Sequence, residues 1–285
     1  METLPEQEMI GDDDRPVVLV TGASSGIGRE VAIRMVRTLD ARLVLAARRG
    51  EQLEETASVA GARDAVLVPC DLSTAAGVDE LVARVRQLGR LDVLVNNAGS
   101  ASDHPFEHPD AMVDADRMLA LNLRTPIALV HALTPLLEQR RGTIVNVSSV
   151  AGLVGTPGSD VYCATKFALT GFSEASRARL QRRGVRVVCV QPGPVPTPGW
   201  PHERLRSTPV LGRVFASDVQ TIADACVRAA RGKGSAAPVR PRIYAGIPLL
   251  RALAPWLLRR LLVRAAGHRR YADGSNAART GDQPT

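Results

Sequence analysis

The sequence lacks the patterns that usually mark metal sites, disulfide frameworks and exported proteins. Its four cysteines are scattered without a C-x-x-C pair, and its five histidines show no ligand spacing, so we predict reduced, mostly buried thiols and no metal. The N-terminus carries glutamates and aspartates where an export signal needs a positive start and an apolar stretch. We therefore expect a cytoplasmic protein.

The sequence also contains no internal repeat at a solenoid period and no linker rich in glycine or serine, so we expect its 285 residues to form one domain. Aromatic residues make up only 3% of the chain. The net charge of +7 belongs to the C-terminal part, because residues 231–285 hold 11 Lys/Arg against 2 Asp/Glu. Without an aromatic platform or a known binding motif there, we predict no nucleic-acid partner.

Apolar runs rich in Val, Leu and Ile alternate with longer stretches of mixed apolar and charged residues. The runs predict buried strands at 17–20, 43–46, 65–68, 91–95, 143–147 and 185–190, with a seventh strand near 242–245. Helices are expected at 27–39, 51–58, 75–88, 116–137 and 164–181. Runs without period-2 alternation, separated by helices, are typical of parallel strands covered on both faces. We predict an α/β fold: a single doubly wound Rossmann-type domain with a mostly parallel seven-stranded sheet and helices on both faces.

These patterns divide the chain into a disordered acidic N-terminus (1–15), the Rossmann-type domain (16–246), a basic, apolar C-terminal helical extension (247–271) and a disordered tail (272–285). Within the extension, residues 247–264 combine many leucines with Trp256 and several arginines. Pro255 and the arginines interrupt the roughly 20 apolar residues that a transmembrane span needs. We expect a surface-lying helix that contacts an anionic membrane, or one that packs on the rest of the chain or on another subunit.

A glycine-rich turn with the spacing G-x-x-x-G-x-G connects the first predicted strand to the first predicted helix. Glycines allow a tight turn and a close approach of the backbone to a pyrophosphate, whose charge the helix N-terminus favours. A flexible turn without a ligand is the alternative, and the position between strand and helix argues against it. The predicted cofactor-binding residues of this turn are Gly22, Ser24, Ser25, Gly26, Ile27 and Gly28.

The second predicted strand ends in Ala47, Arg48 and Arg49, where the adenosine ribose of a dinucleotide should arrive. An acidic residue here would bind the ribose 2′-OH. Two arginines beside a neutral residue suit a 2′-phosphate instead, because guanidinium groups bind phosphate oxygens well. We predict that NADP(H) is preferred over NAD(H). The alternative is two solvated arginines that open the following helix.

Tyr162 and Lys166 are four residues apart and should lie on one face of a helix, thirteen residues after Ser149. A phenol with a pKa near 10 is a poor base at neutral pH. Lowering that pKa to about 7 requires roughly 4 kcal/mol of preferential stabilisation of the phenolate. The ammonium of Lys166 and the positive charge of a bound nicotinamide could supply it.

Taken together, four ordered motifs resemble the short-chain dehydrogenase/reductase family over about residues 16–245. They are the glycine-rich turn, Asn96-Asn97-Ala98-Gly99, Ser149 before Tyr162-x-x-x-Lys166, and Pro192-Gly193-x-Val195-x-Thr197. The resemblance implies that Ser149 hydrogen-bonds the substrate oxygen and that Tyr162 exchanges its proton. It also implies that Lys166 holds the nicotinamide ribose and lowers the pKa of Tyr162, and that Asn122 supports a water-linked proton relay.

The same resemblance implies further cofactor contacts. Asp71 contacts adenine, Asn96 lines the cofactor cleft and Thr197 holds the carboxamide. Three alternatives stay open: Asp71 as a helix N-cap, Asn96 as a link between strand ends, and Ser148 in the place of Ser149. The remaining cofactor-binding residues implied by these motifs are Ala98, Gly99, Pro192, Gly193 and Val195.

The function that follows is hydride transfer between NADP(H) and a carbonyl or secondary alcohol. Residues 194–213 occupy the place of the family's substrate lid, where Trp200 and Leu205 could form an apolar wall for a hydrophobic substrate. The expected partners are a small-molecule substrate and other copies of the chain in a homo-oligomer. The alternative is a catalytically idle dinucleotide-binding regulator of the same fold.

Overall fold

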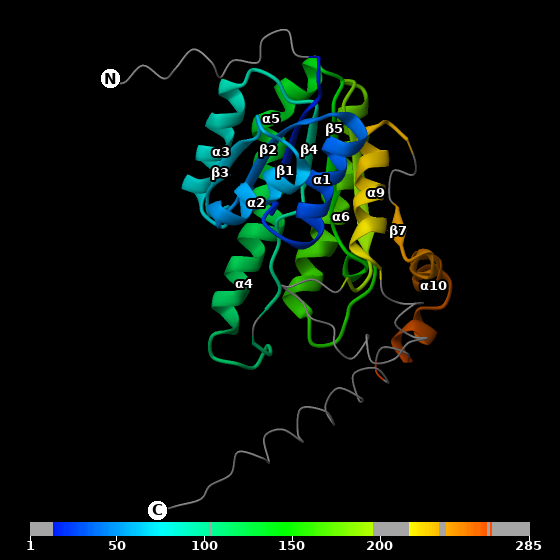
Figure 1. Ribbon diagram of the computed structural model, residues 1–285. Coiled ribbons are helices and arrows are strands. Elements are labelled where there is room, and N and C mark those ends of the chain that lie inside the picture. Colours follow the sequence, from blue (N-terminus) through cyan, green and yellow to red (C-terminus); the bar gives the residue numbers. More distant parts are fainter. Residues whose placement is uncertain (1–13, 103, 196–216, 234–237, 261–262, 264–285) are drawn as a thin grey trace, which may run out of the picture.

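The structure is a computed structural model that describes residues 14–102, 104–195, 217–233, 238–260 and 263 (Figure 1). Its strands are β1 (Val17–Thr21), β2 (Arg42–Ala47), β3 (Val66–Pro69), β4 (Val93–Asn96), β5 (Thr143–Val147), β6 (Arg186–Pro192) and β7 (Val239–Arg240). Its α-helices are α1 (Gly26–Leu39), α2 (Gly50–Ala60), α3 (Ala75–Gln87), α4 (Ala111–Leu119), α5 (Thr125–Gln139), α6 (Asp160–Gln181), α9 (Val219–Ala230) and α10 (Ile247–Leu253). Shorter helical segments are η2 (Ala120–Arg124), η3 (Val150–Gly152) and η4 (Arg242–Gly246).

The strands form one sheet in the order β3-β2-β1-β4-β5-β6-β7, and every neighbouring pair is parallel. The order reverses between β1 and β4. In doubly wound sheets, ligands bind in the crevice outside the carboxyl ends of the strands at this switch point. The predicted fold class is confirmed.

Helices cover both faces of the sheet (Figure 1). Successive residues of β1 point to opposite faces: Val18 and Val20 pack with α1, α2 and α9, whereas Val17 and Leu19 pack with α3, α5 and α6. Because both faces are covered, all five residues of β1 are buried. The absence of period-2 alternation in the sequence has this cause.

The seventh strand lies earlier than the predicted 242–245. β7 has two residues and pairs with Gln191 and Pro192 at the end of β6. Pro241 follows at once, and residues 242–246 form a 3₁₀ helix. Proline has no N–H to donate to a strand ladder and fixes φ near the value of −63° seen here, so the strand ends before it.

The long helix expected at 116–137 is divided into three parts. Helix α4 runs into a π-helical turn, η2, before α5 begins, and the backbone N–H of Thr125 donates to Ala120 in an i→i+5 pattern. Pro126 lacks the N–H that an α-helix would direct to the carbonyl of Asn122. The π turn accommodates this gap, and it contains Asn122 itself, as is common for π-bulges at functional sites.

Residues 14 and 15, at the end of the segment expected to be disordered, contact the domain. Arg15 forms an ion pair with Asp64, and the carbonyl of Asp14 accepts a hydrogen bond from Arg90. Residues 1–13 and the predicted tail 272–285 lie outside the described residues. All four cysteines are free and buried, which confirms that prediction. Among the described residues, no helix is long and apolar enough to cross a bilayer.

Candidate active site

The glycine-rich turn has the close approaches that the motif predicts. Gly22 and Gly26 have φ values of 68° and 55°, in the left-handed region that favours glycine. A Cβ on Gly28 would lie 2.3 Å from the carbonyl oxygen of Gly22, so only glycine fits there. No acidic residue stands in the first turn of α1, and Ser25, at the N-cap, makes no side-chain capping bond. The N–H groups at the start of α1 are therefore suited to an anion.

Thr21 and Asn97 connect this turn to the end of β4. The Thr21 hydroxyl accepts hydrogen bonds from the backbone N–H groups of Asn97 (3.0 Å) and Ala98 (3.1 Å). The Asn97 amide donates to the carbonyls of Thr21 (3.0 Å) and Gly22 (3.3 Å). Neither residue is among the predicted cofactor-binding residues, although Asn97 stands inside the Asn96-Asn97-Ala98-Gly99 motif and Thr21 directly precedes Gly22. They brace the two sides of the switch point.

Arg48 and Arg49 follow β2 and are both exposed. The guanidinium of Arg49 donates to the hydroxyls of Ser24 (3.2 Å) and Ser25 (3.4 Å), so it reaches the glycine-rich turn. Hydrogen bonds from the backbone and hydroxyl of Ser73 lower the pKa of Asp71, and the charge of Arg48 adds to this effect. The two arginines therefore face the glycine-rich turn and Asp71.

Asp71 is not the N-cap of α3, so that alternative is wrong. Thr74 holds that position, and its hydroxyl accepts from the N–H of Gly77 at 3.1 Å. Asn96 is buried, and its amide donates to Asn146 on β5 at 2.8 Å. This hydrogen bond links the ends of β4 and β5, which is the alternative role that the sequence analysis left open for Asn96.

Ser149 and Tyr162 lie within hydrogen-bonding distance of each other, and that bond favours the ionised form of Tyr162. Ser149 also donates to the carbonyl of Pro192 at 3.4 Å. Ser148 points elsewhere: its hydroxyl bonds to the carbonyl of Lys166 and to Thr170, both at 3.0 Å. The geometry therefore favours Ser149 over Ser148 as the partner of Tyr162.

Burial dominates the proton affinities of Tyr162 and Lys166. Loss of solvation raises the pKa of Tyr162 to about 12, against the opposing bond from Ser149. Loss of solvation also lowers the pKa of Lys166 to about 8. The ammonium lies 5.6 Å from the centre of the Tyr162 ring and donates to the carbonyl of Val147 at 3.1 Å. The chain alone therefore keeps Tyr162 as a phenol at neutral pH.

Asn122 is fully buried and holds the loop that follows β4. Its side-chain oxygen accepts from the N–H of Ser100 at 2.8 Å, and its amide donates to the carbonyl of Ser100 at 2.9 Å and to Thr165 at 3.2 Å. A Cβ on Gly99 would lie 3.2 Å from the Asn122 oxygen and 3.7 Å from the Lys166 ammonium. Asn122 and Lys166 thus border the same space beside Gly99.

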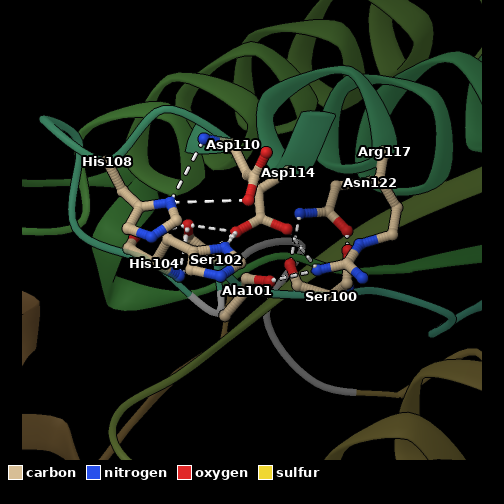
Figure 2. Close-up of polar contacts among 9 residues, drawn as sticks. All are labelled: Ser100, Ala101, Ser102, His104, His108, Asp110, Asp114, Arg117 and Asn122. Atoms are coloured by element: carbon tan, nitrogen blue, oxygen red, sulfur yellow. Dashed lines mark hydrogen bonds and ion pairs between the residues drawn. The ribbon is translucent and has the colours of Figure 1, made fainter. Parts of the chain in front are cut away.

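A second polar cluster secures the same loop further on, as Figure 2 shows. The carboxylate of Asp114 is buried and accepts hydrogen bonds from the Ser102 hydroxyl (2.9 Å) and the backbone N–H of His104 (3.2 Å). It also contacts the Nδ1 atom of the His104 ring (3.0 Å) and forms an ion pair with Arg117 (2.9 Å). No motif in the sequence signals this cluster, because one charged residue on a helix resembles any other.

The structure brings His104, His108 and Asp110 together, with their ligand atoms within 4.8 Å of one another. The four-residue spacing of the two histidines escaped the sequence analysis. Their rings are stacked, with centroids 4.1 Å apart and planes at 17°. The nitrogen lone pairs lie in the ring planes and therefore run nearly parallel, so one ion could not take both without a ring rotation. The absence of a metal stays a prediction.

At the end of β6, Pro192 belongs to the strand, Gly193 follows it, and Val195 is buried in the core. The N–H of Ser217 donates to the carbonyl of Pro194 at 2.9 Å. Thr197 and most of the expected lid, including Trp200 and Leu205, lie outside the described residues.

The described residues fit a dinucleotide. The glycine-rich turn is tightly closed, because a Cβ on Gly22 or Gly28 would collide with backbone, and the N-terminus of α1 that follows it favours negative charge. Arg48 and Arg49 add positive charge at the β2 side of this turn. The Ser149–Tyr162 pair stands at the ends of β5 and α6, on the other side of the β1–β4 switch point.

Comparison with known proteins agrees with this geometry. Residues 16–206 match the family described as short chain dehydrogenase. The bovine dehydrogenase/reductase SDR family member 7B is 32% identical over 278 residues, which is 91% of this chain and 84% of that protein.

Solved structures show the same architecture. The 3-ketoacyl-(acyl-carrier-protein) reductase from Brucella melitensis, complexed with NADH, is 26% identical with a TM-score of 0.69, covering 79% of this chain and 96% of that chain. The bulky-bulky ketone specific alcohol dehydrogenase from Comamonas testosteroni is 28% identical with a TM-score of 0.68, and the match covers 80% of this chain and 87% of that chain. This chain therefore belongs to the short-chain dehydrogenase/reductase family and is an NAD(P)-dependent oxidoreductase of that family.

Proposed function

We propose that this enzyme interconverts a hydrophobic carbonyl compound and its secondary alcohol with NADP(H), and that Tyr162 is the acid/base. The observation that carries the proposal is the Ser149–Tyr162 hydrogen bond with the Lys166 ammonium 5.6 Å from the phenol ring. A hydroxyl pair beside a buried cation can hold a carbonyl oxygen and give it a proton.

In the reducing direction, Ser149 donates a hydrogen bond to the carbonyl oxygen and Tyr162 transfers its proton to that oxygen. When bound, NADPH supplies the hydride that reaches the carbonyl carbon. The high pKa of Tyr162, about 12, keeps the proton in place until it is needed. Lys166 stabilises the phenolate that remains, held by its bond to Val147. Reprotonation proceeds through the space beside Gly99 that Lys166 and Asn122 share.

The preference for NADP(H) rests on the end of β2. Ala47 is neutral and buried, so no carboxylate is available there to bind a ribose 2′-OH. Arg48 and Arg49 are exposed, and Arg49 already binds the hydroxyls of the glycine-rich turn. Guanidinium groups in this place are suited to a 2′-phosphate.

The substrate class and the assembly are part of the same proposal. The bulky-ketone specificity named for the Comamonas testosteroni relative supports a hydrophobic substrate. Met112 and Val113 on α4, with Leu119 and Ile127 nearby, expose large apolar side chains, which supports burial between copies in a homo-oligomer. Light scattering on the full chain tests the assembly, and a strictly monomeric chain would contradict it.

The test of the chemistry is Tyr162→Phe, assayed with NADPH on a panel of bulky ketones. We expect cofactor binding and folding to persist while turnover falls by about 10²–10⁴-fold, because one proton donor is lost. Tyr244→Phe is the matched control, since Tyr244 is a half-buried tyrosine of η4 outside the site, and it should retain activity.

Retention of more than half the activity by Tyr162→Phe would contradict the assignment of the acid/base. A wild-type chain that binds NADPH and turns over no carbonyl or alcohol would instead favour the idle regulator. The intact set of Ser149, Tyr162, Lys166 and Asn122 argues against that alternative.

A further inference from the structure

The C-terminal extension leaves several large apolar side chains exposed, while Ile247, Leu250 and Leu258 are half-buried. Helix α10 ends at Leu253, and a second short helix follows over residues 255–260. The single helix expected from the sequence is broken at Ala254, since the residue before a proline is pushed out of the helical conformation. Leu249, Leu253 and Trp256 are 63%, 74% and 60% exposed.

Helix α10 contacts the enzyme through a cation–π interaction. The guanidinium of Arg251 lies 4.9 Å from the centre of the Phe167 ring on α6. A helix that packed on its own domain would turn its leucines inward and its arginine outward. Here Arg251 points toward the enzyme and contacts Phe167. Figure 1 shows α10 beyond the β7 edge of the sheet. Leu250 and Leu258 are half-buried, whereas Leu249 and Leu253 do not pack on the enzyme.

The charges around this surface identify the kind of partner. Residues 231–272 contain 10 Lys/Arg and no Asp/Glu, whereas residues 1–230 are nearly balanced, with 25 Lys/Arg against 27 Asp/Glu. A second copy carries the same net charge of +7 and therefore offers no net electrostatic attraction to this basic face. An anionic lipid surface offers both negative headgroups and an apolar layer beneath them.

The side chains are also arranged as an interfacial helix requires. The Arg260 guanidinium lies 5.5 Å from the centre of the Trp256 ring, one helical turn away. Tryptophan prefers the boundary between headgroups and acyl chains, and arginine can reach headgroups from a partly immersed position. We propose that Leu249, Leu253 and Trp256, with Arg259 and Arg260, form a docking surface for an anionic membrane.

A contact between distant parts of the chain connects the segment that carries this surface to the helix of the reaction site. Phe167, which Arg251 contacts, follows Lys166 on α6. Docking would hold the enzyme against a phase in which hydrophobic carbonyl compounds concentrate. The docking itself does not depend on the proposed chemistry and is tested without it.

The experiment is flotation of the full chain with vesicles of phosphatidylcholine alone or mixed with phosphatidylserine. We expect binding that requires phosphatidylserine and weakens with salt. Arg259→Gln with Arg260→Gln should weaken binding by about fivefold for each charge removed. Arg179→Gln with Arg182→Gln, two exposed arginines near the far end of α6, is the matched control and should bind as wild type.

The apolar part is tested by Trp256→Ala against Phe106→Ala, since the two rings are 60% and 59% exposed. We expect about a tenfold loss for Trp256→Ala and no loss for Phe106→Ala. Absence of binding to either vesicle, or equal losses in variant and control, would overturn the proposal. A change in oligomeric mass without lipid binding would assign the surface to a second copy and also overturn it.

Discussion

Lys166 offers a direct test of the buried site before any substrate is known. Its pKa is lowered from 10.5 to about 8 by burial. Between those values the unfolded chain binds a proton that the folded chain does not, so the stability of the folded state rises with pH in that window. The perturbation is Lys166→Met, which keeps the length of the side chain and removes the charge.

The magnitude follows from the two pKa values. At neutral pH the buried ammonium lowers the free energy of unfolding by about 3 kcal/mol relative to a group with an unshifted pKa. We expect the gap between wild type and Lys166→Met to change by about 1 kcal/mol between about pH 7 and pH 9, with wild type gaining.

The assay is urea unfolding of the cofactor-free protein at a series of pH values. Burial also raises the pKa of Cys70 to about 11 and of Cys226 to about 12, which lowers stability as pH rises past 9. These thiols are present in both proteins, so the difference between the two curves cancels their effect. A difference that stays constant across the window would refute a lowered pKa at Lys166.

Two further predictions concern the cofactor and the loop after β4. Ala47→Asp with Arg48→Gln should weaken NADPH binding and improve NADH binding, a swing of tenfold or more by fluorescence titration, because each charge-assisted bond is worth about 1.5–3 kcal/mol; equal wild-type affinity for both cofactors would count against the preference. Asp114→Asn should raise KM several-fold with little change in kcat. The variant weakens the contacts that Asp114 makes with His104 in the loop and with Arg117 on α4, and Asn122 holds the same loop. The control is Asp116→Asn, an exposed neighbour on α4, and equal effects of the two variants would show that the loop does not depend on the cluster.

The sequence alone determined the fold class and the order of the first six strands. Valine-rich runs of strand length, separated by helical stretches, indicate a parallel sheet covered on both faces, and a glycine-rich turn after the first strand indicates a ligand at its carboxyl end. The Tyr162-x-x-x-Lys166 spacing places two groups on one helical face because the helical repeat is local. These inferences needed no knowledge of contacts between distant residues.

Only the tertiary structure decided what depends on distant neighbours. Ser148 and Ser149 are adjacent in sequence, and the direction of the chain after β5 turns one toward Thr170 and the other toward Tyr162. Burial sets the pKa values of Tyr162 and Lys166, and spacing carries no information about burial. The cluster around Asp114 joins a loop to a helix. The same holds for the extension: its composition predicted an apolar helix, and only the structure shows that Arg251 contacts Phe167 while Leu249, Leu253 and Trp256 stay exposed.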